Sequence, residues 1–311
     1  MKLAPIVMFV YNRADHFEQT YEALCQCDEA KESELYIFSD GAKTEKDVSK
    51  VEAVRAAIRE KEQRRQFKQV HIVESQENRG LAKSVIAGVT RVVGEWGSVI
   101  VLEDDSVVSP YFLKFMNQSL EYYTKNQSVG SIAGYTPKLR NSEEYTDDVF
   151  FAYRSCSCAW ATWKDRWENV DWELKEMQNF YRDAKLVQRL NANGSDRFLR
   201  LYRQTKGNGS SWSVRFGAHL IKKNMLTVYP KYSYVQNIGC DASGVHSKEE
   251  DAEKMQVDIS KALSEVHLIE PYIDTKIQKA MKRHYSGGVL SDIKRAVATK
   301  AVVLWNRRNK D

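Results

Sequence analysis

Three consecutive carboxylates stand directly after a run of four aliphatic residues. Val99–Leu102 is followed by Glu103, Asp104 and Asp105. Four aliphatic residues in a row are typical of a strand that is covered on both faces, as in a parallel sheet. Neighbouring carboxylates repel and raise one another's pKa, and a divalent cation offsets that cost. Hard oxygen donors suit Mg²⁺ or Mn²⁺, and the competing interpretation is a solvated acidic turn.

Strands and helices are expected to alternate over the first hundred residues, in a pattern that positions these acids. The expected strands are Ile6–Tyr11, Leu35–Ser39, Val70–Val73 and Val99–Leu102, and the expected helices are Asp15–Cys27, Val48–Phe67 and Leu81–Val93. Strands alternating with helices of this length imply βαβ units with right-handed crossovers. We therefore expect an α/β fold with a mostly parallel central sheet and helices on both faces.

Polar residues follow each expected strand, and the clusters are Asn12-Arg13, Asp40-Gly41, Glu77-Asn78-Arg79-Gly80 and Glu103-Asp104-Asp105. Ligands of open α/β sheets bind beyond the carboxyl ends of the strands, so four clusters on one edge predict a nucleotide-sized site. Neither G-x-G-x-x-G after the first strand nor G-x-x-x-x-G-K-[ST] occurs. The charge of a bound diphosphate would therefore be neutralised by a metal and by Arg13, Arg79 and Lys83.

The order of these segments resembles the GT-A nucleotide-sugar glycosyltransferases. Val101–Asp105 followed by Pro110–Phe112 is similar to the metal segment of the N-acetylglucosaminyltransferase I-like branch. Later segments add to the resemblance: Cys158–Trp167, Ser211–Phe216 and Leu226–His246. The last of them looks like family 2-like bacterial sugar transferases that build polysaccharides. The resemblance spans residues 3–246 and implies a GT-A fold. It also implies transfer of a hexosyl or N-acetylhexosaminyl group from a nucleotide diphosphate sugar, a UDP-sugar first, to a glycan or lipid-linked acceptor in surface polysaccharide assembly.

The resemblance also implies roles for the donor-side residues. Asp40 would hydrogen-bond the base, and the ribose and diphosphate would be approached by Asn12, Arg13, Asn78, Arg79 and Lys83. Asp40 could instead be a plain turn former before Gly41.

A divalent cation would be held by Asp105, with Glu103 and Asp104 holding sugar, ribose or metal-bound water. His246 would add a metal ligand or a diphosphate contact, and the alternative for His246 is a histidine of a surface loop. The cation would act as a Lewis acid on the leaving nucleoside diphosphate.

An inverting transfer needs a carboxylate base beside the acceptor hydroxyl. The related branch uses a Trp-Asp pair for this role, and the corresponding position here is Trp212-Ser213. Serine is not a general base at neutral pH without help, so Asp241, Asp196 and Asp165 are the candidates. Asp241 ranks first because it shares a short segment with His246. A retaining mechanism and Glu103 as the base both stay open.

Acceptor binding is expected at aromatic residues of the middle of the chain, because aromatic faces stack on pyranose rings. Trp160, Trp212 and Ser213 are the expected acceptor contacts, and ordinary core packing is the alternative for Trp160. Trp212 follows the polar, glycine-rich stretch Gly207–Ser211. Loops of that composition form closing segments, so Trp212 is expected on a lid.

Three segments are expected: a nucleotide-sugar-binding half at 1–105, an acceptor-binding half at 106–250 of the same domain, and a helical basic tail at 251–311. Between residues 276 and 310 the sequence holds ten Lys or Arg and one acid, Asp292, against a whole-chain formal charge of +5. After Gly287-Gly288, apolar residues recur at helical spacing: Val289, Ile293, Ala296, Val297, Ala301, Leu304 and Trp305.

A basic amphipathic helix of this kind is expected to lie on an anionic membrane surface. A helix packed on the catalytic core or on a second subunit is the alternative. Nucleic acid is not an expected partner, because stacking aromatics are not interleaved with the basic residues.

Segment composition bears on the compartment. The first residues form a strand rather than an apolar leader, and no run reaches the ~20 apolar residues of a membrane span. Five cysteines are an odd number, so reduced thiols in the cytosol are expected. The expected location is cytoplasmic, peripheral on the inner membrane face.

Two other function classes compete with the transferase. A nucleotidyltransferase would also place carboxylates and a metal beside a nucleotide, but it would normally bring a glycine-rich basic loop near the first strand, and Tyr11–Asp15 is not such a loop. A non-catalytic scaffold that binds carbohydrate or membrane is the other alternative, and Ser213 in place of a carboxylate is its best evidence.

Overall fold

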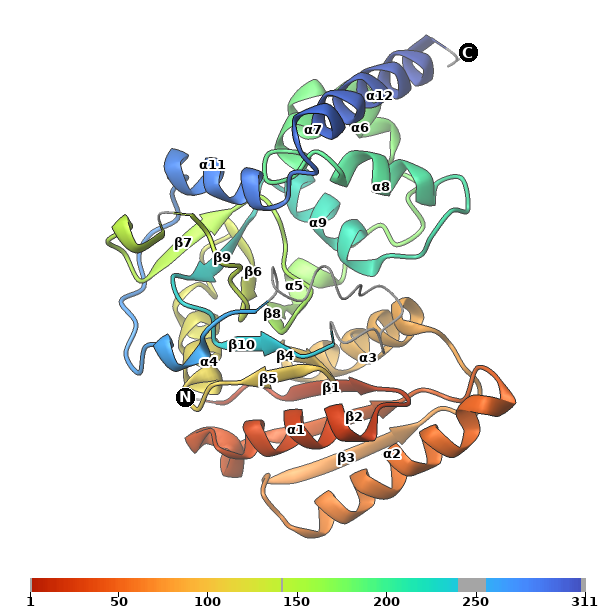
Figure 1. Ribbon diagram of the computed structural model, residues 1–311, viewed down its shortest axis with the longest axis vertical. Helices are drawn as coiled ribbons and strands as arrows, with labels where there is room; N and C mark the ends of the chain where they lie inside the picture. Colours follow the sequence, from red (N-terminus) through yellow and green to blue (C-terminus); the bar gives the residue numbers. More distant parts are fainter. Residues whose placement is uncertain (1, 141, 240–255, 309–311) are drawn as a thin grey trace.

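The computed structural model describes residues 2–140, 142–239 and 256–308 (Figure 1). Its first half contains β1 (Ile6–Val10), α1 (Ala14–Cys25), the 3₁₀ turn η1 (Asp28–Glu32), β2 (Glu34–Ser39), α2 (Glu45–Gln63), β3 (Gln69–Glu74), α3 (Leu81–Trp96) and β4 (Ser98–Glu103). The predicted alternation is confirmed, with ends shifted by a few residues. Helix α2 begins before Val48 because Thr44 and Asp47 form a reciprocal capping box at its N-terminus.

The rest of the chain adds short strands and a group of helices. They are β5 (Ser106–Val108), α4 (Phe112–Tyr122), β6 (Val129–Ala133), η2 (Ser142–Glu144), β7 (Val149–Ala152), β8 (Trp160–Trp163), α5 (Lys164–Trp167), α6 (Gln178–Arg182), α7 (Ala184–Leu190), α8 (Arg197–Gln204), α9 (Trp212–Lys222), β9 (Leu226–Pro230), β10 (Val235–Asn237), η4 (Ile259–Lys261), α11 (Thr275–His284) and α12 (Val289–Arg308).

The main sheet has the strand order β3-β2-β1-β4-β8-β6-β9-β7. Strands β3, β2, β1 and β4 are parallel neighbours, so their carboxyl ends share one edge. Strand β8 runs antiparallel to both β4 and β6, β9 is parallel to β6, and β7 is antiparallel to β9. Strands β5 and β10 form a separate antiparallel ribbon. The sheet is therefore mostly parallel, as expected.

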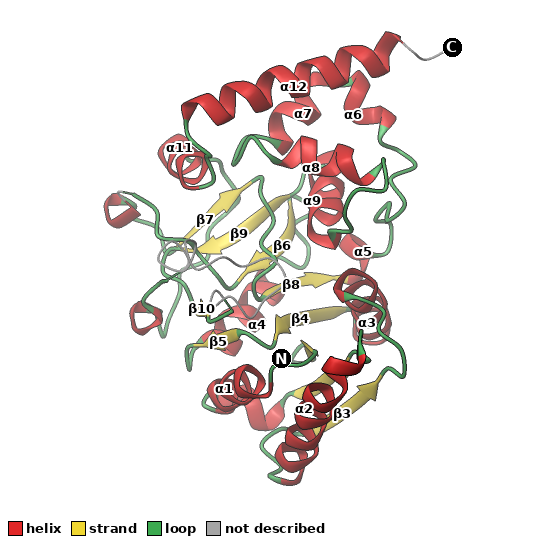
Figure 2. Cartoon of the chain, turned by 45° about the vertical axis from the view of Figure 1, so that its right-hand side comes forward, coloured by secondary structure: helices red, strands yellow, loops and turns green. Residues whose placement is uncertain are grey.

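Helices cover both faces of this sheet (Figure 2). Strand β1 shows why, because its side chains alternate between two cores. Ile6, Met8 and Val10 pack in the core that also contains residues of α1, α2 and α4, whereas Val7 and Phe9 pack in the core of α3 and α9. Each face of β1 is thus apolar and covered, which explains the continuous aliphatic runs.

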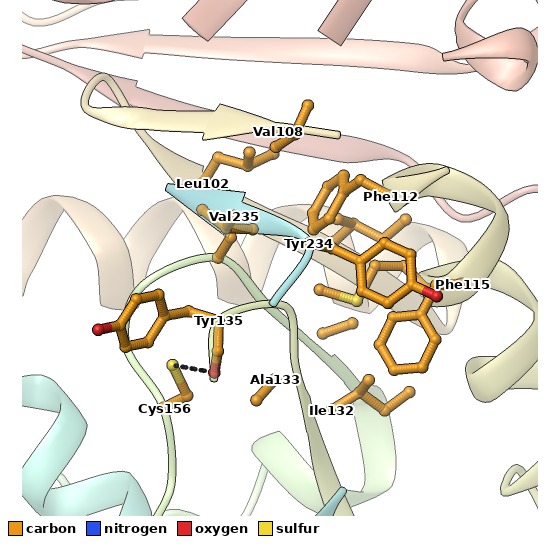
Figure 3. Packing of buried hydrophobic residues seen from close by; sticks show 14 of the residues in the cluster. Leu102, Val108, Phe112, Phe115, Ile132, Ala133, Tyr135, Cys156, Tyr234 and Val235 are labelled. Atoms are coloured by element: carbon orange, nitrogen blue, oxygen red, sulfur yellow. Dashed lines mark hydrogen bonds between the residues drawn. The ribbon is translucent and has the colours of Figure 1, made fainter. Parts of the chain in front are cut away.

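The β5–β10 ribbon is fixed by the larger core (Figure 3). Val108 of β5 and Val235 of β10 belong to this core together with Phe112 of α4, and the ring of Tyr234 stacks on Phe115 at 4.6 Å between centroids. Leu102, just before Glu103, belongs to the same core, and β5 begins at Ser106, just after Asp105. The chain is therefore held on both sides of the acidic triplet.

The same core extends into the last segment of the chain, where Ala262, Ile277 and Met281 are buried members. Residues of all three expected segments therefore share one core, and the boundaries at 105 and 250 mark order along the chain rather than separate cores.

The last helix, α12, packs through a face other than the apolar stripe. Val302 and Val303 contact the third core, formed by residues of α6 to α9, and Thr299 is buried. The stripe residues are exposed instead, with Val289 at 77% and Val297 at 65% relative exposure. Helix α12 therefore does pack on the rest of the chain, as the alternative expected, but its apolar stripe takes no part in that packing. Among the described residues, no helix combines the length and the apolar character needed to cross a bilayer.

Candidate active site

The carboxyl end of β2 is joined to the loop before α3 through Asp40. One carboxylate oxygen accepts hydrogen bonds from the backbone N–H groups of Arg79 and Gly41, and the other accepts from the N–H of Gly80. The side-chain amide of Asn78 donates to the carbonyl of Gly41 at 2.8 Å. Gly41 has no room for a Cβ, which would lie 2.5 Å from the carbonyl carbon of Glu77. Two strand-end loops are thereby held in contact.

Ion pairs connect the carboxyl ends of β1 and β4. The Arg13 guanidinium forms ion pairs with Asp104 and with Asp105, the latter at 3.0 Å. Burial opposes ionisation of Arg13, but the two carboxylates outweigh it and raise its pKa. The hydroxyl of Thr20 also donates to the carbonyl of Asp104 at 2.7 Å. The expected clusters after the four parallel strands therefore do meet at one edge.

Asp105 is oriented from the β10 side. The side-chain amide of Asn237 donates to one oxygen of Asp105 at 3.1 Å, and the backbone N–H of Ile238 donates to the Asp105 carbonyl at 2.9 Å. Gly239 leaves the space for this carboxylate, because a Cβ there would collide with Asp105 and come within 3.0 Å of Arg13. Asn237 was missed in the sequence, since an uncharged amide after a short strand gives no signal of its own.

Crowding of the acids changes their protonation. Burial raises the pKa of Glu103 to about 8, with further contributions from Asp105 and Asp104. Burial also raises the pKa of Asp104 to about 6, although Arg13 opposes this shift. Negative charge at this edge is thus costly without a cation, which is the condition that the sequence predicted.

The donors present fit a divalent cation. Asp105 offers carboxylate oxygens and its side chain is 14% exposed, so a cation can reach it. Within the described ranges, no group of three or more His, Cys, Asp or Glu side chains could hold a metal without other ligands. Magnesium-type sites commonly use one or two carboxylates plus substrate phosphates, so a single accessible carboxylate beside a diphosphate site is sufficient.

The remaining donor-side residues lie around this edge. The amide of Asn12 donates to Asp47 at 3.2 Å at the start of α2. Arg79 and Lys83 are exposed, on the loop before α3 and on its first turn. Arg79 and Lys83 thus present exposed cations on the segment that follows β3, at the same edge of the sheet.

Comparison with known proteins identifies the class of this arrangement. The profile of Glycosyl transferase family 2 matches residues 6–171, which is 166 of the 311 residues. The chain belongs to glycosyl transferase family 2. No curated protein sequence matches it. The solved chain of S. aureus TarS is similar at 13% identity with a TM-score of 0.37, over 54% of this chain and 30% of that one. Family membership, together with the mostly parallel sheet covered by helices on both faces, gives the chain a GT-A type fold.

The two tryptophans expected at the acceptor of this family 2 chain lie in its core. Trp160 is 1% exposed and Trp212 is 4% exposed, and their rings stack with centroids 4.9 Å apart. Trp167 and Phe216 complete the cluster around Trp160. Neither indole face is open to a sugar in this structure, and Trp212 is not on a lid. The glycine-rich stretch before Trp212 indicated a loop correctly, but the ring itself turns inward.

Two of the described candidates for the base, Asp165 and Asp196, are unsuited to it. Strand β8 runs antiparallel to β4 and Trp163 pairs with Ser98, so Asp165 lies beyond the opposite edge of the sheet from Glu103. Burial opposes ionisation of Asp196, but neighbouring arginines outweigh it and lower its pKa, which makes a weaker base.

Ser213 is the remaining predicted site residue that the structure describes. The hydroxyl of Ser213 lies 3.2 Å from that of Ser211, on α9. Asp241 and His246 lie outside the described residues, so their predicted roles as base and metal ligand stay predictions.

Proposed function

We propose that this family 2 enzyme transfers a hexosyl or N-acetylhexosaminyl group from a UDP-sugar to a glycan or lipid-linked acceptor in surface polysaccharide assembly. Membership of the family supports a glycosyltransferase that uses a nucleotide-sugar donor. The single observation that carries the proposal is the position of Asp105. It stands at the carboxyl edge of four parallel strands, with Arg13 on one oxygen and Asn237 on the other.

The donor would lie along this edge. Asp40 already accepts three backbone N–H groups, so it holds the Asn78–Gly80 turn in place as well as offering a lone pair to a base N–H. Arg79 and Lys83 would neutralise phosphate charge from the exposed side. Arg13 and Asn12 would approach the diphosphate from the end of β1, and Asp104 would remain ion-paired beneath them.

Asp105 would hold Mn²⁺ or Mg²⁺, with His246 as a second protein ligand. When bound, the cation supplies charge neutralisation for the leaving nucleoside diphosphate. Asn237 and Gly239 fix the orientation of Asp105, and the guanidinium of Arg13 places a positive charge between Asp104 and Asp105.

Activation of the acceptor hydroxyl is assigned to Asp241, with inversion at the sugar. Asp241 follows Gly239 by two residues in the sequence, and Gly239 is the residue whose backbone lies against Asp105. Glu103 is the second candidate for the base. Burial and the neighbouring acids raise the pKa of Glu103, which disfavours the ionised form that a base needs, so it ranks below Asp241.

The cytoplasmic location, peripheral on the inner membrane face, belongs to the same proposal. The outward stripe of α12 supports it, because exposed Lys294, Lys300, Arg307 and Arg308 accompany the exposed apolar residues. Basic and apolar residues on one exposed helix favour an anionic membrane surface, and nucleic acid stays an unexpected partner.

The test is calorimetric binding of UDP to the full chain with and without MnCl₂. Asp105→Asn should abolish the Mn²⁺-dependent part of the affinity, because the amide cannot act as an anionic ligand. Asp28→Asn is the matched control, an exposed carboxylate on η1, which leads into the opposite end of β2. Equal UDP affinity for the wild type and Asp105→Asn in MnCl₂ would contradict the proposal. Release of UMP rather than UDP from the donor would favour a nucleotidyltransferase.

A further inference from the structure

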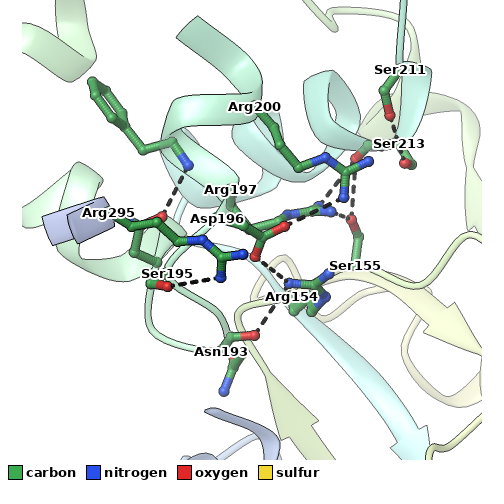
Figure 4. Close-up of polar contacts among 12 residues, drawn as sticks. Arg154, Ser155, Asn193, Ser195, Asp196, Arg197, Arg200, Ser211, Ser213 and Arg295 are labelled. Atoms are coloured by element: carbon green, nitrogen blue, oxygen red, sulfur yellow. Dashed lines mark hydrogen bonds and ion pairs between the residues drawn. The ribbon is translucent and has the colours of Figure 1, made fainter. Parts of the chain in front are cut away.

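A cluster of arginines lies outside the acidic edge, where loop 153–159 meets α8 and α9 (Figure 4). Asp196 is the shared anion: Arg154 contacts one of its oxygens at 3.3 Å, and Arg200 contacts the other at 3.4 Å. Arg197, between them in the sequence of α8, is 4% exposed. We call Arg154, Arg197, Arg200 and Asp196 the arginine cluster. Its three cations and one anion leave a net charge of +2.

Arg197 is the member of the arginine cluster without an ion pair at contact distance, since both oxygens of Asp196 are taken by Arg154 and Arg200. Its Nη2 donates to the hydroxyl of Ser155 at 3.2 Å and to the carbonyl of Ser213 at 3.4 Å, both neutral acceptors. Its Nε is buried and has no hydrogen-bond partner. Among the described residues, no carboxylate lies within ion-pair distance of Arg197. A buried charge whose nearby anion is already paired with two other cations is disfavoured, so the net charge of +2 favours binding of an anion.

The surrounding backbone makes room for these guanidinium groups. A Cβ at Gly217 would lie 2.6 Å from Nη2 of Arg197, and a Cβ at Gly194 would lie 2.7 Å from Nη1 of Arg154. The Arg154 guanidinium also lies 3.7 Å from the ring centroid of Tyr285, which restricts its position. The cations are thus held in fixed places, as recognition of a planar or tetrahedral oxyanion requires.

The arginine cluster is open on one side and connected to the donor edge on the other. The side chain of Arg200 is 44% exposed and that of Asp196 is 20% exposed, so an anion can enter there. Toward the donor edge, Ser155 is three residues from Cys158, at most about 11 Å of extended chain. The sulfur of Cys158 lies 3.7 Å from the amide of Asn237, which holds Asp105.

We propose that the arginine cluster binds an anionic group, a phosphate or a carboxylate, carried by the acceptor. Its oxygens would pair with Arg200 and with the unpartnered Nε of Arg197. This inference rests on the proposed function, because it names the chemistry of the acceptor that the transferase recognises.

The test uses inorganic phosphate as the probe and the full chain, at constant ionic strength set with NaCl. Phosphate should raise the Tm of the wild type saturably. Arg200→Gln should weaken the phosphate Kd by roughly tenfold, as expected for one charge-assisted contact. Arg203→Gln is the matched control, because Arg203 is exposed on the same helix and takes no part in the arginine cluster. Equal weakening by both variants, or no phosphate effect beyond that of NaCl, would overturn the proposal.

A second variant, Arg197→Met, separates loss of phosphate binding from loss of folding. Removing a buried charge that forms no ion pair at contact distance should leave the Tm in phosphate-free buffer nearly unchanged, while the phosphate effect is lost. A normal phosphate effect in Arg197→Met would contradict the assignment.

The acceptor side is distinguished from the donor side with UDP and MnCl₂. Saturating UDP should leave the phosphate Kd unchanged, and Arg200→Gln should keep the wild-type UDP affinity. Competition between phosphate and UDP would place the anion at the donor diphosphate and overturn the inference. Failure of the wild type to bind UDP would contradict the proposed function and leave the phosphate result to stand by itself.

Discussion

Arg13 pairs with Asp104 although 91 residues separate them in the sequence. The pair closes the edge between β1 and β4, and it gives the 3%-exposed Asp104 its counter-charge. An arginine that the sequence assigned to a phosphate therefore first serves the acids of its own chain. A cation bound at Asp105 would free part of that guanidinium for the donor.

Replacing Arg13 should expose this dependence. In Arg13→Gln, Asp104 and Asp105 lose their cation, and we expect the free energy of unfolding to fall by about 3 kcal/mol in EDTA. Part of the loss should return in MnCl₂. Urea unfolding measures both values, and Arg79→Gln, an exposed arginine, should change stability by less than about 0.5 kcal/mol. An equal loss with and without Mn²⁺ would show that the cation does not share this charge.

Trp212 should behave as a core residue. Trp212→Ala removes a ring stacked on Trp160, so unfolding should become easier by about 3–5 kcal/mol. Trp305→Ala provides the comparison, since Trp305 is 56% exposed and its loss should cost little. Thermal or urea unfolding checks both variants. A Trp212→Ala protein with wild-type stability and an altered acceptor KM would restore the acceptor role.

Acid should destabilise the protein through His219. Burial lowers the pKa of His219 to about 4, and Lys223 adds to the shift. The unfolded chain binds a proton near pH 6.5 and the folded chain does not, so stability is present above pH 6.5 and is lost as pH falls toward 4. The contribution is about 3 kcal/mol. His219→Gln should flatten stability over this range, measured by urea unfolding, whereas exposed His267→Gln should not.

The outward face of α12 should carry membrane binding. Val297→Ser combined with Leu304→Ser should reduce sedimentation with vesicles of equal parts phosphatidylglycerol and phosphatidylcholine, while the Tm stays unchanged because both side chains are exposed. Val48→Ser, which changes an exposed valine of α2, is the control for the sedimentation experiment. Binding should also weaken with salt. Full sedimentation of the double variant would exclude this face.

Local pattern predicted the elements well where burial was continuous. The aliphatic run before Glu103 and the helical spacing of Val85, Val89 and Val92 predicted β4 and α3, because Val99–Leu102 is buried throughout and one face of α3 is buried along its length. The sequence also placed the acids at a strand end, which the parallel order β3-β2-β1-β4 turns into a shared edge.

Non-local contacts account for what could not be predicted. The stacking of Trp212 on Trp160 joins residues 52 positions apart. The reversal of β8, which carries Asp165 away from the site, depends on strand direction, and side-chain periodicity is the same for either direction. Asp40 gave a turn signal, but its bonds to the N–H groups of Arg79 and Gly80 come from a loop 39 residues later.

The bare backbone at Gly239 has one more consequence. Because a methyl group there would strike the Asp105 carboxylate and crowd Arg13, position 239 tolerates no chemical variety while those two side chains keep their places. A single added carbon would push the Asp105 carboxylate away from its ion pair with Arg13. The spatial tolerance of the catalytic edge is thus set by a residue that contributes no functional group at all.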